Sequence, residues 1–315
     1  MKKILVKTLR FLAKKILKKY KPEIIGVTGS FGKTSTKEAV FAVLSSKFNV
    51  RRNIKNYNNE IGLPLTIIGA GSPGRSVLGW LGVFFQAFFL LVLKQDYPKI
   101  LILEMAVDHP GDMDYLVDLA LPKIGVVANI GAVHLEYFKT VERIAKEKAK
   151  IVTRIKDGWA VLNADNELVL GIKDQVKCPV LTYGLGSKAD LRAQEINISH
   201  NDLKEKGIAG ISFKMIYQGN VMPVLLPNIL GEHLVYAALA GAALGIIYGM
   251  NLMEISQALQ SFKAPKGRMN LIDGIKKTLI IDDTYNAGPD STLAALKVLG
   301  RIPGRRWAVL ETCWN

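Results

Sequence analysis

A glycine-rich loop opens the part of the chain whose charged and hydroxyl side chains could do chemistry. The stretch GVTGSFGKTSTKE follows a short apolar run and leads into a helical pattern. In such a loop, backbone N–H groups and the positive end of the following helix close on phosphates. Lys33 is expected to reach the β- and γ-phosphates of a nucleotide, and the hydroxyl of Thr34 is expected to ligate Mg²⁺.

The loop departs from the strict phosphate-loop pattern in its first glycine. The pattern places glycine five residues before Gly32, where this chain has Val27. A glycine turn with a chance GKT is therefore the alternative, but the flanking strand and helix patterns favour a phosphate site. The residues expected to line it are Gly29, Ser30, Gly32, Lys33, Thr34 and Ser35.

Two further side chains follow other predicted strands. Glu104 ends the apolar run KILILE, where its carboxylate could face the glycine-rich loop and hold Mg²⁺ directly or through water. A solvated acid at a strand end is the alternative, and the neighbouring loop favours the metal. His134 follows the run IGVVANIG and is one of four histidines. By itself it reads as a structural histidine rather than a ligand.

A parallel sheet would bring these side chains together. The runs EIIGVTG, KILILEMA, IGVVANIG and WAVLNAD are short and continuously apolar, as buried parallel strands are. Helical patterns at residues 34–46 and 141–155 fit between them. The alternation predicts an α/β fold with a doubly wound, mostly parallel sheet and sites at the carboxyl ends of its strands.

The rest of the chain suggests three parts. Residues 191–227 read as a small antiparallel patch, and the connector KAPKGRMN reads as a domain boundary before a further strand–loop–helix pattern. We therefore expect a basic amphipathic helix at 1–22, a central domain at 23–265 and the start of a partial C-terminal Rossmann-like α/β domain at 266–315.

Composition points to an anionic partner. The net charge is +15 over 315 residues, which favours nucleotides, nucleic acid or acidic lipid. A nucleic-acid enzyme is disfavoured, because aromatic residues do not interleave with the basic ones and no nucleic-acid module is recognisable. Two distant cysteines suggest no disulfide framework and fit a reducing cytosol.

Two segments raise the question of a membrane. Residues 1–21 carry nine Lys/Arg and no acid, with apolar residues at helical spacing, so a membrane-surface helix and a helix packed on its own domain are both open. The apolar stretch 77–93 is short for a span, and a span would separate the glycine-rich loop from Glu104. An in-plane membrane helix and a helix buried against a neighbour remain, the buried one favoured.

Several blocks, in order, resemble the Mur ligase family, and the MurF type in particular. They are TGSFGKTSTKE, NYNNEIGLPLTI, LEMAVDHPGDMDYL, NIGAVHLEYF and DDTYNAGPDSTLAAL. The resemblance implies an ATP-dependent, amide-forming ligase of peptidoglycan precursor synthesis. Its partners would be a muramoyl-peptide precursor and the dipeptide D-alanyl-D-alanine, and no nucleic acid is expected. An ATP-binding protein without ligase activity is the alternative.

The resemblance also implies roles for single residues. Thr34 with Glu104 would hold one Mg²⁺, and His134 with Lys148 a second, Lys148 as a carbamate. A carbamate forms only on an unprotonated amine, so a site that lowers the pKa of Lys148 is needed. Further matches are nucleotide contacts from the C-terminal part and two polar residues lining the site. They are Arg268, Asp283, Tyr285 and Asn286, and Asn59 and Asn129.

The chain also departs from the family pattern. In GEHLVYA, Leu234 and Ala237 stand where two asparagines are expected, so adenine-side contacts are not predicted from this block. Only the basic helix precedes the first strand, where the resemblance implies a UDP-binding domain. A cytoplasmic location is expected, with peripheral contact at the acidic inner face of the membrane as a further hypothesis.

The C-terminal residues RRWAVLETCWN raise a last expectation. Trp307–Leu310 reads as the start of a buried strand, which the family continues as Gly-Asp-Met-Leu-Glu-Leu. Codons for Cys-Trp-Asn read one base earlier encode Leu-Glu, so we expect a single-base frameshift near Leu310. A chain cut short there would bind ATP weakly, expose apolar surface and fail to complete ligation.

Overall fold

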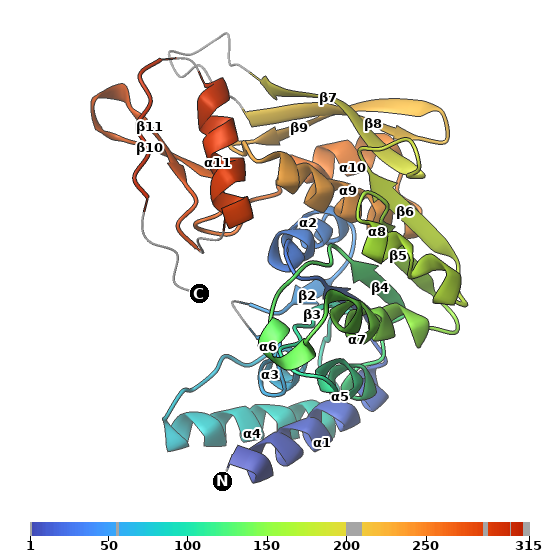
Figure 1. Cartoon of the computed structure of the whole chain (residues 1–315). Helices are drawn as coiled ribbons and strands as arrows, with labels where there is room; N and C mark the ends of the chain where they lie inside the picture. Colours follow the sequence, from blue (N-terminus) through green and yellow to red (C-terminus); the bar gives the residue numbers. More distant parts are fainter. Residues whose placement is uncertain (1, 55–56, 200–209, 286–288, 303, 311–315) are drawn as a thin grey trace.

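The computed structural model describes residues 2–54, 57–199, 210–285, 289–302 and 304–310. Its centre is a nine-stranded sheet of order β2-β3-β1-β4-β5-β6-β7-β8-β9 (Figure 1). The strands are β1 Glu23–Thr28, β2 Val50–Arg52, β3 Ile100–Glu104, β4 Ile124–Val127, β5 Trp159–Asn163, β6 Val180–Gly184, β7 Leu191–Ser199, β8 Gly210–Tyr217 and β9 Asn220–Pro227.

The predicted doubly wound, mostly parallel sheet is confirmed. Within this sheet, pairing is parallel along the order from β2 to β7, and the β7–β8 and β8–β9 pairs are antiparallel. The predicted antiparallel patch is present and is joined to the parallel strands, because Tyr183 and Gly184 of β6 pair with Leu191 and Arg192 of β7. The patch therefore continues the parallel sheet at its edge, because β7 uses the free hydrogen-bonding groups of β6.

Helices cover both faces of the sheet. On one face, α2 (Lys33–Ser45), α9 (Glu232–Ile247) and α10 (Leu252–Leu259) bury one set of strand side chains. The opposite face is covered by α1 (Lys2–Tyr20), α3 (Gly62–Ile68), α5 (Asp112–Leu119) and α7 (Val141–Thr153). Because both faces are covered, the central strands are continuously apolar, as the sequence pattern indicated.

The small residues of α9 allow a close helix contact. A Cβ added at Gly241 would lie 2.9 Å from the backbone carbonyl atoms of Ala39 in α2. Glycine is needed where two backbones approach this closely. The run of small residues in α9 thus places α2, and the loop before it, firmly on the sheet.

Two helices extend the molecule on the face of α3. α1 buries Leu9, Ala13 and Ile16 against its own domain, so one side of the basic helix is packed and its other side is exposed. Next to α1 lies α4 (Val77–Val92), of which only Val83, Ala87 and Leu90 are buried (Figure 1). The prediction that this helix is buried against a neighbour is therefore wrong for most of its residues.

The connections between the main elements hold short helices. The short ones are α6 Leu135–Phe138, α8 Glu167–Leu170 and the 3₁₀ turns η1 Lys173–Gln175 and η2 Ile275–Lys277. Across the described ranges, every helix is too short or too polar to cross a membrane.

The C-terminal part is a hairpin and one helix. β10 (Asn270–Asp273) pairs antiparallel with β11 (Leu279–Asp282), and α11 (Pro289–Arg301) follows. Trp307–Leu310 was predicted to begin a buried strand, and this is wrong: the segment forms no ladder and Val309 is fully exposed. A strand there would need a neighbouring strand to pair with, and no described strand lies beside it. The expected exposure of apolar side chains is thus present here, while the domain boundaries stay predictions.

Candidate active site

The glycine-rich loop joins the carboxyl end of β1 to α2. It is fastened to the segment after β4, because the N–H of Ser30 donates to the carbonyl of Asn129 at 2.7 Å. The hydroxyl of Ser30 also lies 3.0 Å from both the carbonyl oxygen and the nitrogen of Gly131. A Cβ at Gly29 would meet Asn129 backbone atoms at 3.1 Å, and Gly32 has φ 76°. Gly29 and Gly32, the two glycines predicted to line the site, are therefore favoured by close approach and by backbone conformation, respectively.

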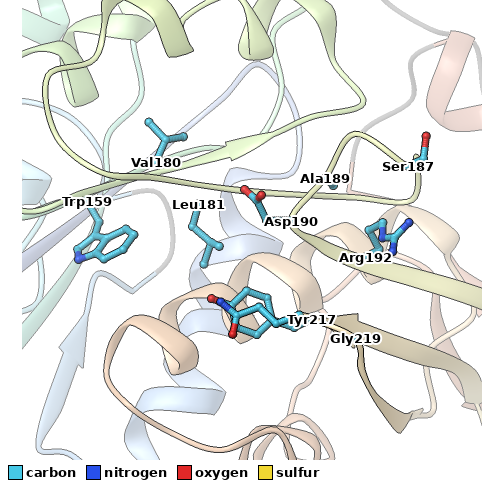
Figure 2. Close-up of a pocket in the computed structure, with 10 residues that line it drawn as sticks. Trp159, Val180, Leu181, Ser187, Ala189, Asp190, Arg192, Tyr217 and Gly219 are labelled. Carbon is cyan, nitrogen blue, oxygen red and sulfur yellow. The ribbon is translucent and has the colours of Figure 1, made fainter.

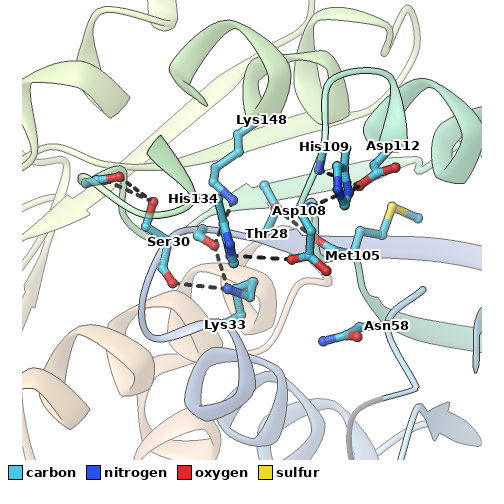
Figure 3. A network of polar contacts seen from close by, with 12 residues as sticks. Thr28, Ser30, Lys33, Asn58, Met105, Asp108, His109, Asp112, His134 and Lys148 are labelled. Atoms are coloured by element: carbon cyan, nitrogen blue, oxygen red, sulfur yellow. Dashed lines mark hydrogen bonds and ion pairs between the residues drawn. The ribbon is translucent and has the colours of Figure 1, made fainter. Parts of the chain in front are cut away.

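Lys33 begins α2 and turns back over the loop. Its Nζ donates to the carbonyls of Gly29 at 2.7 Å and Ser30 at 3.1 Å (Figure 3). Burial lowers the pKa of this amine, and the charge of Glu104 opposes that shift. The ammonium thus lies at the loop, where it was predicted to meet phosphates.

Glu104 lies beside the loop because of strand register. β3 pairs with β1 so that Glu104 is opposite Val27, one residue before the end of β1. The carboxylate is 2% exposed, and its Oε1 accepts from the hydroxyl of Thr34 at 3.3 Å. Its Oε2 lies 3.5 Å from Nζ of the buried Lys37. The predicted pair of Thr34 and Glu104 is therefore brought together.

The same carboxylate identifies a residue that sequence reasoning missed. Asn58 donates its Nδ2–H to Oε1 of Glu104 at 3.0 Å. Its neighbour Asn59, which was expected to line the site, instead accepts the N–H groups of Ile61 and Gly62 at 3.2 and 3.0 Å and caps α3. The run NYNNE was the signal, but it does not tell which asparagine faces the acid.

The oxygens of Thr34 and Glu104 fit a Mg²⁺ ion. Glu104 Oε2 is buried and has no hydrogen-bond donor, although the ammonium of Lys37 lies 3.5 Å away, so this oxygen can still accept a cation as a ligand. Mg²⁺ is commonly held by one or two carboxylates together with substrate phosphates rather than by a protein cage. Among the described residues there is no group of three or more His, Cys, Asp or Glu side chains that could hold a metal ion by themselves.

Ser35, also predicted to contact phosphate, lies in the first turn of α2. It is 2% exposed, and its hydroxyl is buried without a hydrogen-bond partner. A buried hydroxyl in that condition is costly unless it has a partner. This orphan group fits an oxygen-rich ligand at the loop.

Lys148 reaches the loop from α7. It is 1% exposed, and its Nζ donates to the carbonyl of Gly29 at 3.0 Å. Burial, and then the charge of Lys33, lower the pKa of Lys148 to about 7. The site therefore has the property that a carbamate requires, a substantial fraction of neutral amine at neutral pH.

His134 approaches the same place from the loop after β4. It has φ 53° at the start of α6, and its Nε2 lies 3.4 Å from Oδ1 of Asp108. Asp108 was not singled out by the sequence. The pKa values of Lys33 and Lys148 are lowered by burial, and the negative charge of Asp108 partly opposes both shifts. Asp108 therefore lies near both amines (Figure 3).

Two carboxylates hold the loop that carries Asp108. Asp112 accepts the N–H groups of Asp108 and His109 at 2.9 and 2.7 Å. Glu147 of α7 accepts those of Gly111 and Met113, each at 3.0 Å. Because Glu147 precedes Lys148, one helix positions both the amine and the start of α5.

Of the candidate nucleotide contacts predicted in the C-terminal part, Arg268 lies near the glycine-rich loop. The positive charge of Arg268 lowers the pKa of Lys33, and its guanidinium stacks 4.3 Å from the ring centre of Tyr285. Asp283 accepts the N–H of Met269 at 3.2 Å, and burial raises the pKa of its carboxyl. Asn286 lies outside the described residues.

The altered GEHLVYA block has a packing role here. Leu234 is fully buried and Ala237 is 2% exposed, both within the core that α9 forms with α2. These two side chains are therefore part of the core under the loop.

A surface hollow lies away from these residues. It has a volume of about 490 Å³ and is lined by Trp159, Asp190, Arg192 and Tyr217, among others (Figure 2). The carboxylate of Asp190 is occupied by the N–H and the hydroxyl of Thr182, at 2.9 and 2.6 Å. None of the residues of the glycine-rich loop line this hollow, and it carries no functional argument.

The fold and the loop define a P-loop α/β protein with a phosphate site at the switch point of its sheet. The family model of the Mur ligase middle domain matches residues 27–72 and 85–245. The chain therefore belongs to the Mur ligase family. The matched segments leave out residues 73–84.

Curated relatives and solved structures agree with this assignment. The UDP-N-acetylmuramoyl-tripeptide--D-alanyl-D-alanine ligase of Bacillus subtilis is 30% identical over 296 residues, which are 94% of this chain and 57% of that protein. That of Escherichia coli is 31% identical, over 91% of this chain and 57% of the relative. The chain thus spans little more than half the length of these relatives.

Among solved structures, MurF ligase from Thermotoga maritima in complex with ADP has a TM-score of 0.76 at 29% identity, covering 95% of this chain and 62% of that one. MurF from Acinetobacter baumannii has a TM-score of 0.77 at 27% identity, covering 96% and 59%.

Proposed function

We propose that this chain carries the ATP site of an acid–amino-acid ligase of peptidoglycan precursor synthesis. The observation that carries the proposal is the meeting of Lys33, Thr34 and Glu104 at one end of the parallel sheet, with Thr34 Oγ1 3.3 Å from Glu104 Oε1. The relatives of similar sequence support a muramoyl-tripeptide as the acid and D-alanyl-D-alanine as the amine.

The reaction proceeds in two displacements. A carboxylate oxygen of the acid attacks the γ-phosphorus of ATP, the bond from that phosphorus to the bridging β-oxygen breaks, and ADP leaves. The amine then attacks the acyl carbon, the C–O bond to phosphate breaks, and the amine nitrogen loses a proton. Such transfer depends on positioning and charge neutralisation more than on covalent help.

The side chains of the loop supply these needs. The ammonium of Lys33 offsets charge on the β- and γ-phosphates, and the N–H groups of the loop orient them. The oxygens of Thr34 and Glu104 would hold one Mg²⁺, which supplies charge neutralisation on the phosphates. Arg268 approaches from the C-terminal side, near enough to lower the pKa of Lys33. Asp283 and Asn286 stay predicted nucleotide contacts.

Lys148 belongs to the proposal as a carbamate. The ammonium would first lose a proton to solvent; the neutral amine would then attack CO₂ and release a second proton, which leaves a carbamate anion next to His134 and Asp108. That anion and the imidazole of His134 would hold a second Mg²⁺. The lowered pKa, about 7, supports this chemistry, because only the unprotonated amine reacts.

The location proposed with this function is the cytoplasm, at the inner face of the membrane. Nucleotide and sugar-peptide precursors would be met there, and the net charge of +15 favours acidic lipid. No nucleic acid is part of the proposal.

Hydroxylamine trapping tests the ligase against an ATP-binding protein without ligase activity. The 315-residue chain is incubated with Mg·ATP and the muramoyl-tripeptide, without the dipeptide, and hydroxylamine converts any acyl phosphate to a hydroxamate. A hydroxamate in wild type and none in Lys33→Ala supports the ligase. ATP binding by calorimetry with no ADP and no hydroxamate supports the alternative.

A further inference from the structure

Helix α4 presents an apolar stripe on the outside of the molecule. Leu78, Leu81, Phe85, Phe88 and Val92 follow one another at spacings of three and four residues, and they are between 47% and 79% exposed. Residues at that spacing lie on one side of a helix. The whole helix, VLGWLGVFFQAFFLLV, contains no charged residue. Contiguous exposed apolar patches of this kind mark interaction sites.

The helix is held firmly at both ends. At its start the hydroxyl of Ser76 accepts the N–H of Gly79 at 3.1 Å. At its end Nζ of Lys19 donates to the carbonyls of Leu90 and Leu93 at 2.8 and 2.6 Å, and the hydroxyl of Tyr20 donates to Leu90 at 2.9 Å. The stripe is therefore a fixed surface of the fold, fastened to α1.

Helix α1 adds a second exposed stripe that is basic. Ile4, Lys7, Phe11, Lys14 and Lys18 recur with the same spacing and are all exposed. Both helices bury their other side in the same hydrophobic cluster, so both stripes point away from it. The two helices lie side by side, on the other side of the sheet from α9 and α10 (Figure 1).

We infer that the stripes of α1 and α4 together form a docking surface for an anionic lipid bilayer. Aromatic and aliphatic side chains of α4 enter the boundary between head groups and acyl chains, and the lysines of α1 meet the lipid phosphates. The inference rests on the peripheral location proposed above, and it identifies the face and the lipid class. It does not depend on the ligase chemistry.

Charge selects the bilayer over a second copy of the chain. Residues 2–21 carry nine Lys/Arg and no acid, so a symmetric contact between two such faces would bring like charges together. The stripe also begins in residues 73–84, which lie outside the matched family segments.

Vesicle flotation tests the surface on the whole chain without nucleotide. Wild type is expected to float with vesicles of phosphatidylglycerol and phosphatidylcholine and to stay at the bottom with phosphatidylcholine alone. Phe85→Glu with Phe88→Glu is expected to weaken binding at least about tenfold, because two large apolar side chains no longer enter the bilayer. Lys7→Glu with Lys14→Glu should lower binding to the phosphatidylglycerol vesicles by a similar factor.

Matched controls change the same residue types on other faces. Val221→Glu with Met253→Glu, both exposed, and Lys173→Glu with Lys263→Glu are expected to float like wild type. Calorimetric titration with Mg·ATP on every variant separates this surface from the nucleotide site. Failure of wild type to float, equal flotation of the Phe85/Phe88 variant, or lipid-free self-association that this variant abolishes would overturn the inference.

Discussion

The ammonium of Lys148 donates a 3.0 Å hydrogen bond to the carbonyl oxygen of Gly29, which lies 119 residues earlier in the chain. The bond joins α7 to the phosphate loop in the interior of the protein. Lys33 donates to the same carbonyl at 2.7 Å, so two amines converge on one oxygen. Their mutual repulsion adds to burial in lowering the pKa of Lys148 to about 7. The predictions below start from this arrangement.

Lys148 should form a carbamate whose amount rises with pH. The neutral fraction of the amine increases as the pH passes the value of about 7, so a carbamate signal from ¹³C-labelled bicarbonate should grow between mildly acidic and mildly alkaline solution. Carbon NMR detects it without any turnover.

Lys148→Ala should lack the signal. Lys150→Ala should keep it, because Lys150 on the same helix is paired with Asp114 and Glu147 and its pKa is raised. A signal of equal size in Lys148→Ala would remove the carbamate from the site. If acyl phosphate formation occurs, Lys148→Ala should also lose it without rescue by bicarbonate, and short carboxylic acids should restore part of it.

The buried amine should also make stability depend on pH. Between about 7 and its ordinary value of 10.5, Lys148 is neutral in the folded chain and protonated in the unfolded chain. The unfolded state therefore binds more protons, and the free energy of unfolding rises with pH by up to ~1.4 kcal/mol per unit for this group. Urea titrations across this range measure the slope.

Lys148→Met should flatten that slope relative to wild type. The variant should still show part of the pH dependence, because the pKa of Lys33 is lowered as well. Lys33 therefore also makes the free energy of unfolding rise with pH. Parallel slopes in the two proteins would mean that Lys148 is not buried as an amine.

Lys33→Ala should weaken Mg·ATP binding by at least about tenfold, since a hydrogen bond to a charged group contributes ~1.5–3 kcal/mol. Calorimetric titration is the measurement. Lys47→Ala is the control, because Lys47 lies just beyond the far end of α2 and pairs with Glu254 at 2.6 Å. Wild-type affinity in Lys33→Ala would show that the loop is not the phosphate site.

Glu147→Ala should destabilise the chain by ~1–3 kcal/mol, because it leaves the N–H groups of Gly111 and Met113 without their acceptor. Thermal unfolding measures the loss. Lys146→Ala, at an exposed position of the same helix, should unfold almost as wild type does. If both variants unfold alike, the carboxylate of Glu147 does not stabilise the start of α5.

The sequence alone determined the sheet, the loop and most of the chemistry-bearing residues. Continuous apolar runs identify buried parallel strands, and the spacing of Gly29, Gly32, Lys33 and Thr34 identifies a phosphate loop, because both signals are local. The need for a lowered pKa at Lys148 could also be stated in advance, although its cause could not.

Tertiary structure decided what depends on register and on burial. Asn58 rather than Asn59 meets Glu104, and Asp108 stands among His134, Lys33 and Lys148, because strands and loops distant in sequence end at the same edge. Trp307–Leu310 has strand composition but no neighbouring strand to pair with. The stripe of α4 looks like a core helix in the sequence, and only the packing of the chain shows that most of it faces outward.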